Sequence, residues 1–129
     1  MKTTDLFIKK ACEDGRPMDL KLPNGETIKE ALNVIGADSD AFADEIAISR
    51  QKEIDLYEKK EKISPAEYAK QYKKIREETI SCLVTGWAFD EPFNRDAVIV
   101  LYINAPYVLE QVDKFASIRE NFFVKPSLD

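Results

Sequence analysis

The residues whose chemistry could support a reaction are few, and the most suggestive are two neighbouring carboxylates. Asp90 and Glu91 lie near Trp87 in an aromatic-rich stretch, and a pair of carboxylates could hydrolyse a glycoside or abstract a proton. Loop acids that precede a helix are, however, far more often turn formers and helix caps. The chain also has no histidine, which removes the commonest general base near neutral pH and the Ser-His and Cys-His nucleophile pairs. The sequence therefore predicts no enzyme and no catalytic residue.

Motifs for metals, disulfides and cofactors are also missing. Asp38 and Asp40 resemble the start of a calcium loop, but the sixth position of that loop is Ala43, where the pattern requires glycine. Cys12 and Cys82 fall in no paired motif, so they predict two free thiols. The glycines stand singly and begin no phosphate-binding loop. We expect no metal and no cofactor.

The charge pattern argues against nucleic acid and membranes as partners. The formal net charge is -5, from 24 acidic and 19 basic side chains, and this sign repels phosphate backbones and anionic lipid surfaces. The lysine-rich runs 59–62 and 73–74 are interleaved with acids at helical spacing, which is typical of solvated helix faces. No stretch approaches the roughly 18 apolar residues of a membrane span, and residues 1–10 lack the apolar centre of a signal peptide. We expect a cytosolic protein.

The first third of the chain carries the turn signals and the strand pattern. The composition, 44% hydrophobic and 33% charged, is near the globular average, and we see no linker, so residues 1–129 are expected to form a single domain. Residues 18–22 alternate apolar with polar side chains, as in a half-buried strand. Residues 31–35 could pair with them, although 27–35 also fits a helix; we favour the strand. Residues 5–13 fit either a short opening helix or an extended arm.

The remainder of the chain reads as helical. Asp38-Ser39-Asp40 offers caps for a helix over about 38–62, whose apolar stripe is incomplete, so we expect it to project into solvent. Ser64-Pro65-Ala66-Glu67 is a capping box for a central helix that should reach about Thr85. Its strong periodicity places Tyr68 and Tyr72 in the core, with their hydroxyls in water.

Two more helices are expected after an aromatic-rich loop over 87–93. Asn94 should cap the first, in which residues 97–103 are almost continuously apolar, so that this helix is expected to be largely buried. Pro106 ends or kinks it and opens the next, which continues to Phe122 or Phe123. The predicted fold is mainly α (α+β): a strand-containing part at 1–36 with a small β-hairpin, a helical part at 38–123 with about four helices, and a loose tail at 124–129.

One group of aromatic side chains stands out as a candidate protein-interaction site. Large aromatic residues anchor many protein interfaces. The alternative is that they fill the core between the last helices, and for any single member we favour that alternative. The candidate residues are Trp87, Phe89, Phe93, Phe122 and Phe123.

Several short motifs together resemble one protein family. They are Pro23-Asn24-Gly25-Glu26, the run Asn33-Val34-Ile35-Gly36-Ala37-Asp38-Ser39-Asp40-Ala41-Phe42, Trp87 with Phe89, and the closing Arg119-Glu120-Asn121-Phe122. Over roughly residues 17–123 the chain resembles the tail assembly chaperones of long-tailed, lambdoid bacteriophages. Gly36 and Asp38 can also be explained by turn and cap physics alone.

The resemblance implies a concrete role. Such a chaperone coats the tape measure protein in the cytoplasm of the host cell, keeps it soluble, helps recruit tail tube subunits, and is absent from the mature virion. The half-apolar first long helix and the many aromatics lead us to expect homo-oligomers. The main alternative is a small phage or bacterial adaptor or inhibitor that binds one folded protein partner.

Overall fold

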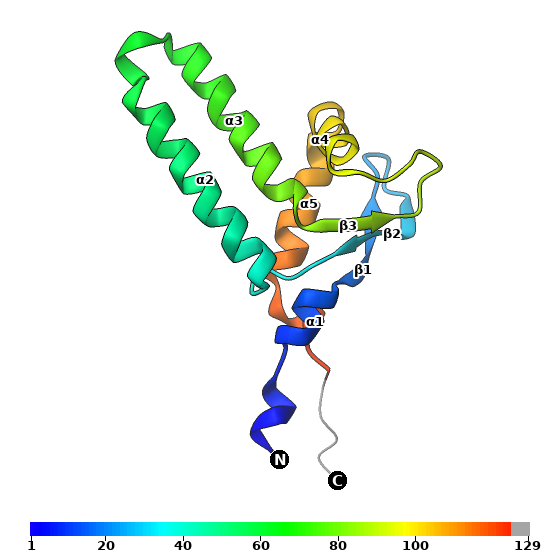
Figure 1. Ribbon diagram of the computed structural model, residues 1–129. Coiled ribbons are helices and arrows are strands. Elements are labelled where there is room, and N and C mark those ends of the chain that lie inside the picture. Colours follow the sequence, from blue (N-terminus) through cyan, green and yellow to red (C-terminus); the bar gives the residue numbers. More distant parts are fainter. Residues whose placement is uncertain (125–129) are drawn as a thin grey trace.

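A computed structural model, which describes residues 1–124, consists of helices around a small sheet (Figure 1). The helices are α1 (Lys9–Asp14), α2 (Asp40–Glu58), α3 (Pro65–Ser81), α4 (Arg95–Asn104) and α5 (Pro106–Ser117), and the strands are β1 (Arg16–Lys21), β2 (Thr27–Val34) and β3 (Val84–Trp87). Short 3-10 helices cover Thr3–Leu6, Lys60–Lys62 and Arg119–Phe122. The predicted mainly α (α+β) class and its N-terminal hairpin are confirmed. Within residues 1–124 there are five α-helices instead of about four, because α1 precedes the hairpin.

The sheet has one strand more than the sequence predicted. β1 and β2 form the expected antiparallel hairpin, with Met18 opposite Leu32, so the strand interpretation of the second run is confirmed. β3 pairs antiparallel with the other edge of β2, placing Trp87 opposite Leu32. The prediction that the central helix continues to Thr85 is therefore wrong: α3 ends at Ser81 and the chain turns into β3. Backbone pairing with β2 decided this segment, whose side-chain spacing alone fits a helix.

A glutamine of α5 occupies part of the outer edge of the sheet. The side chain of Gln111 accepts a hydrogen bond from the backbone N–H of Lys21 at 2.9 Å and donates one to its carbonyl at 2.8 Å. β1 is an edge strand, because the strand order is β1-β2-β3. Gln111 therefore satisfies both backbone groups of Lys21 and fixes α5 against the sheet.

The main core lies between the sheet, α4 and α5. Its fully buried members include Leu32 and Val34 of β2, Leu83 before β3, and Val98 and Val112 of the two last helices. None of its fully buried members comes from residues 37–79.

Tyr102 of α4 adds one polar group to this core. Its hydroxyl donates to the carbonyl of Ile80 at 3.1 Å, and burial raises the pKa of Tyr102 far above its ordinary value. A buried hydroxyl that keeps its partner costs little to bury and fixes α4 against the end of α3.

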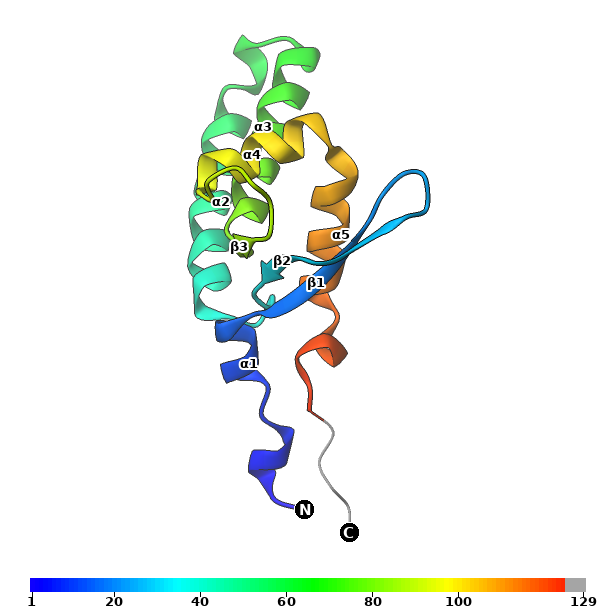
Figure 2. The same ribbon diagram turned by 90° about the vertical axis from the view of Figure 1, so that its right-hand side faces the viewer.

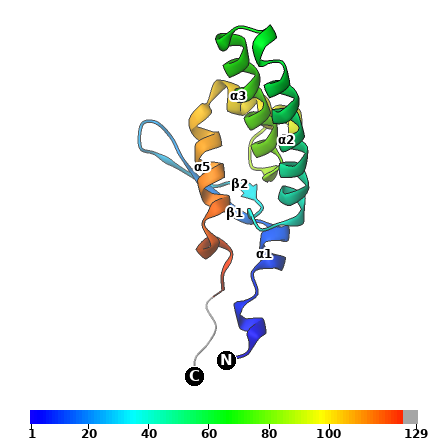
Figure 3. The same cartoon turned by 90° about the vertical axis from the view of Figure 1, so that its left-hand side faces the viewer.

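α2 and α3 form a helical hairpin that projects beyond this core (Figures 1 and 3). We call residues 40–79 the arm and the rest of residues 8–122 the body. Ser39 and Ser64 cap the two helices, accepting from Phe42 N at 3.3 Å and Glu67 N at 3.1 Å, as the sequence predicted. α2 buries only Ser49 and Leu56 along its length. The prediction of a projecting first long helix is confirmed, although it ends at Glu58 and a 3-10 turn follows.

The tyrosines of α3 depart from the prediction. Tyr68 is half-buried, but Tyr72 is 46% exposed, so placing both in the core was wrong. The reason is that the outer half of α3 packs only against α2 and extends past the body.

Two motifs that are distant in the sequence meet where the arm joins the body. Arg119 donates to both oxygens of Asp38, from Nε at 2.8 Å and from the terminal nitrogen at 3.1 Å. Gly36 lies so close to α1 that a Cβ built on it would meet Sγ of Cys12 at 2.5 Å. Gly36 is thus required by close approach and Asp38 by an ion pair, whereas the helix cap itself is Ser39. The turn explanation holds, because the backbone N–H of Ser39 donates to the carbonyl of Gly36 at 3.0 Å, but Asp38 is not the helix cap.

The N-terminal end of the chain lies away from the tip of the arm (Figure 2). Val124 is exposed, and the rest of the loose tail predicted at 124–129 lies outside the described residues. Between residues 1 and 124, no helix combines the length and the apolar composition needed to cross a membrane.

Candidate protein-binding site

α4 carries an apolar surface that the rest of the described chain leaves open. Val98 and Tyr102 are fully buried, whereas Val100 and Ile103 are 57% and 52% exposed. The prediction that this helix is largely buried is therefore wrong for these two residues, because α3 and α5 cover only part of its circumference. A helix that is apolar all round is normally buried on every side. The open side of α4 is thus suited to contact with another protein.

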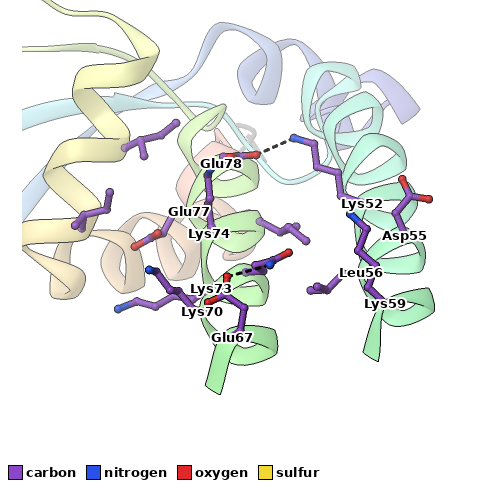
Figure 4. A pocket seen from close by; sticks show the side chains of 14 residues that line it. Lys52, Asp55, Leu56, Lys59, Glu67, Lys70, Lys73, Lys74, Glu77 and Glu78 are labelled. Carbon is purple, nitrogen blue, oxygen red and sulfur yellow. Dashed lines mark hydrogen bonds and ion pairs between the residues drawn. The ribbon is translucent and has the colours of Figure 1, made fainter. Parts of the chain in front are cut away.

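A trough of about 710 Å³ follows α3, with α2 on one side and α4 on the other (Figure 4). Apolar side chains from all three helices line it: Leu56 of α2, Ile75 of α3, and Ile99 and Ile103 of α4. Leu56 is buried but lies outside the main core. One exposed residue of α4, Ile103, therefore also contributes to the trough.

The charged lining of the trough contains more lysine than carboxylate. The lysines are Lys52, Lys59, Lys70, Lys73 and Lys74, and the carboxylates are Asp55, Glu67, Glu77 and Glu78. Lys52 pairs with Glu78 at 2.8 Å. Among the described residues, no carboxylate lies within ion-pair distance of the other four lysines. Five lysines against four carboxylates give the trough a formal charge of +1, although the whole chain carries -5.

Arg95, the first residue of α4, holds the three helices of the trough together at one end. Its guanidinium donates to Ser81 Oγ at 2.9 Å and to the carbonyl of Glu78 at 2.7 Å, both at the end of α3. It also forms a close ion pair with Glu45 of α2. Charge-assisted hydrogen bonds of this kind are the stronger ones in proteins, so Arg95 sets how α2, α3 and α4 meet.

Arg76 fixes α3 on its other side. It lies within hydrogen-bonding distance of Glu110 at 3.2 Å and of Asp113 at 3.4 Å, both on α5. α3 is therefore tied to α2, α4 and α5, which gives the trough a defined shape without any bound molecule.

The structure separates the five aromatic residues that the sequence grouped. Trp87 contacts Phe89 and Phe93 edge to face, with ring centroids 5.5 and 5.4 Å apart. Phe122 instead packs on Phe115 of α5 and is 2% exposed, which is the behaviour of a core residue. Phe93 and Phe123 are each 39% exposed. Trp87 at the end of β3 forms one cluster with Phe89 and Phe93 of the following loop, in which Trp87 and Phe89 pack against the main core and Phe93 is exposed; Phe122 does not belong to it.

A family model decides what kind of protein this is. The model described as phage tail assembly chaperone matches residues 2–116. The chain belongs to the phage tail assembly chaperone family. No curated protein and no solved structure matches it. The match confirms the family that the sequence resembles, and it ends before the closing motif at 119–122.

The carboxylates and thiols that could take part in a reaction do not form a common site in the chaperone. Asp90 and Glu91 are exposed in the β3–α4 loop, and the carbonyl of Glu91 accepts a hydrogen bond from Trp87 Nε1 at 2.8 Å. Cys12 and Cys82 are free thiols, as predicted. Burial raises the pKa of Cys82 to about 11 and also raises that of Cys12. Within residues 1–124, no three metal-ligating side chains come together.

Sequence reasoning missed the trough of the chaperone. The run 73–74 was interpreted as a solvated face, and both lysines are indeed exposed, but they also line the trough together with Ile75. The signal that could have found it is the nearly uninterrupted apolar run 97–103, which is too long to be buried by a chain that exposes two such charged helices.

Proposed function

We propose that this chaperone binds and solubilises the tape measure protein and helps recruit tail tube subunits during tail assembly. The observation that carries the proposal is the open apolar side of α4 beside a preformed trough, in a chain of this family. A client with long helices needs apolar surface on its chaperone and no chemistry. The proposed role is therefore non-catalytic.

We further propose that copies of the chaperone associate with one another. The supporting observation is the number of large side chains that stay open: Leu6 and Phe7 near the start of the chain, and Ile54 and Tyr57 on α2, are each more than half exposed. Scattered apolar residues are normal on a surface, but several on two separate regions suit contacts with both a client and a neighbour. Light scattering at tens of micromolar should give a mass above 14.8 kDa; a strict monomer contradicts self-association.

We place the work of the chaperone in the cytoplasm of the infected cell, and expect it to be absent from the finished particle. An acidic surface keeps an assembly intermediate soluble, which is what such a place requires. Mass spectrometry of purified virions should find tail tube and tape measure peptides and no peptide of this chain; recovery in virions at the stoichiometry of a tail subunit contradicts the proposal.

The decisive experiment is co-expression with the tape measure protein of the same phage. We expect the tape measure protein to move from the insoluble to the soluble fraction and to co-purify with the chaperone. The control is expression of the tape measure protein alone. If the client stays insoluble and unbound, the proposed role is wrong for this chain, and a small adaptor that binds one folded partner replaces it.

A further inference from the structure

We infer that the trough between α2, α3 and α4 binds one amphipathic helix of the partner, with apolar residues on its inner face and carboxylates along its flanks. This inference rests on the proposed function, because it names the part of a client that the chaperone would hold. It goes further in assigning the site and the chemistry of the segment that enters it.

The walls of the trough favour a helix over an extended strand. They consist of α2, α3 and α4, whose backbone groups are bonded within each helix, so the trough offers no row of free N–H and C=O groups. An extended segment gains most of its affinity by pairing with such a row at a sheet edge. A helix needs only apolar contacts for one face, and these are supplied by Ile75, Ile99 and Ile103, which are partly or largely exposed.

The length of the trough sets the spacing of the partner's anchors. Its lining residues on α3 run from Glu67 to Glu78, which corresponds to about 16 Å along a helix. A partner helix laid alongside would offer about three turns over that distance. Apolar residues at i, i+3 or i+4, i+7 and i+11 cover such a span on one face.

The lysines determine the charge of the partner. Lys59, Lys70, Lys73 and Lys74 make no ion pair among the described residues, whereas Glu78 is neutralised by Lys52. Asp55 and Glu67, which accept hydrogen bonds from the amides of Gln51 and Gln71 at 3.0 Å, and the buried Glu77 keep their charges, so four unpaired lysines face three carboxylates.

Ammonium groups on flexible stems beside an apolar lining can cover that lining and reach carboxylates on a partner. A helix with basic flanks would meet these groups with like charge. The carboxylates of the partner therefore belong on the flanks of its apolar stripe.

Two synthetic peptides test the charge assignment directly. Both are helices of about 20 residues with the same leucine stripe, one with glutamate and the other with lysine at the flanking positions. By fluorescence anisotropy at low salt, the glutamate peptide should bind at least about tenfold more tightly, and the difference should shrink at about 0.5 M salt. Equal binding, or tighter binding of the lysine peptide, overturns the inference.

Methyl NMR of the complete chain locates the binding. The glutamate peptide should shift the methyl signals of Leu56, Ile75, Ile99 and Ile103. Shifts confined to the surroundings of Trp87 and Phe93 would place the peptide on the aromatic cluster and overturn the assignment of the trough.

A matched pair of isoleucine substitutions tests the site with the client itself. Ile103→Asp and Ile48→Asp each replace an isoleucine that is about half exposed, but only Ile103 lines the trough. Ile103→Asp should weaken binding of the glutamate peptide and the tape measure protein at least about tenfold. Ile48→Asp, on α2, should change it by less than about twofold. Equal loss in both variants overturns the inference.

A second pair of variants distinguishes the effect of the trough lysines from the effect of the net charge of the chain. Lys70→Glu with Lys74→Glu should abolish the preference for the glutamate peptide, whereas Lys21→Glu with Lys62→Glu gives the same net charge outside the trough and should retain it.

Failure of the inference can be told from failure of the proposed function. If the tape measure protein co-purifies with the wild type and equally with both trough variants, the client binds elsewhere and only the inference fails. If the trough variants leave the client bound but change the mass of the free protein, the trough holds a second copy, which also overturns the inference.

Discussion

The body and the arm of this chaperone are built on different principles. The body joins residues from both ends of the chain in one core, in which Leu32, Leu83 and Val112 are completely or almost completely buried. The arm contributes no fully buried member to that core, and α2 buries only Ser49 and Leu56. Most of its other side chains are charged or polar, and several apolar ones, such as Ile48, Ile54 and Tyr57, are exposed. The comparison teaches that the body supplies most of the stability of the fold. The arm is mainly exposed and is fixed to the body by a few polar contacts at its base.

The largest expected effect is the loss of stability on truncating a buried side chain of the body, compared with truncating an exposed side chain of the arm. Leu83→Ala should lower the free energy of unfolding by about 2–5 kcal/mol, because a fully buried side chain leaves a cavity. Ile54→Ala on α2, where the side chain is half exposed, should cost less than about 0.5 kcal/mol. Urea unfolding measures both. Similar losses in the two variants would show that the arm is as tightly integrated as the body and would break the comparison.

A pair of glycine substitutions sharpens the boundary between the two regions. Gly36→Ala should destabilise by about 1–3 kcal/mol, because its Cβ would overlap the side chain of Cys12. Gly86→Ala is the matched control, since nothing lies within 4 Å of a Cβ there. In thermal unfolding, Cys12→Ala should recover part of the loss in the Gly36→Ala background, as expected for residues in contact. An unchanged loss would mean that the close approach to α1 is not the cause.

A smaller effect is expected where Arg95 ties the arm to the body. Arg95→Met keeps the aliphatic stem but removes the bonds to Glu78, Ser81 and Glu45, at a cost of about 1 kcal/mol for a partly exposed group. Hydrogen exchange should speed up in α2 and α3 more than in β2 and α5. Arg50→Met, an exposed arginine on α2, serves as the control. Exchange that rises uniformly over the chain would argue that Arg95 stabilises the whole fold and not the junction.

The smallest expected effect is a pH dependence at the same junction. The hydrogen bonds from Arg119 hold the pKa of Asp38 below its ordinary value, so the ion pair stabilises the folded state at neutral pH. That contribution is lost as the pH falls through the folded-state pKa. The wild type should therefore be slightly more stable than Asp38→Asn at pH 7, and this difference should vanish in acid.

The control for that titration is Asp90→Asn, which removes an exposed loop carboxylate. In this variant the change in stability between neutral and acid pH should be close to that of the wild type. If the difference in stability between the wild type and Asp38→Asn is the same at every pH, the effect is due to packing and not to the ion pair.

Much of the fold follows from local signals in the sequence. Ser64 and Asn94 were identified as helix caps and Ser39 as one of three candidates for the first cap, and each accepts the expected hydrogen bond from a backbone N–H. The hairpin followed from alternation and turn residues. These features depend on neighbours in the chain, which a sequence displays directly.

The rest depends on residues that are distant in the chain. β3 exists because β2 is available to pair with it, and its own spacing fits a helix equally well. Tyr72 has the spacing of a core residue but lies on a part of α3 that no other layer covers. The candidate aromatics were grouped by type, and the structure separated Phe122 from Trp87 because α5 supplies its packing partner. The trough needs three helices at once, which no single periodic pattern can indicate.

Gln111 also limits the addition of a foreign strand at the β1 edge of the sheet. An edge strand with free backbone groups is a template on which another copy can add a strand, and such additions grow into aggregates. At Lys21 both groups are already bonded to the amide of Gln111, so this position of the β1 edge cannot accept a foreign strand. Copies of the chaperone that come close together therefore cannot join by backbone pairing at this position of the β1 edge.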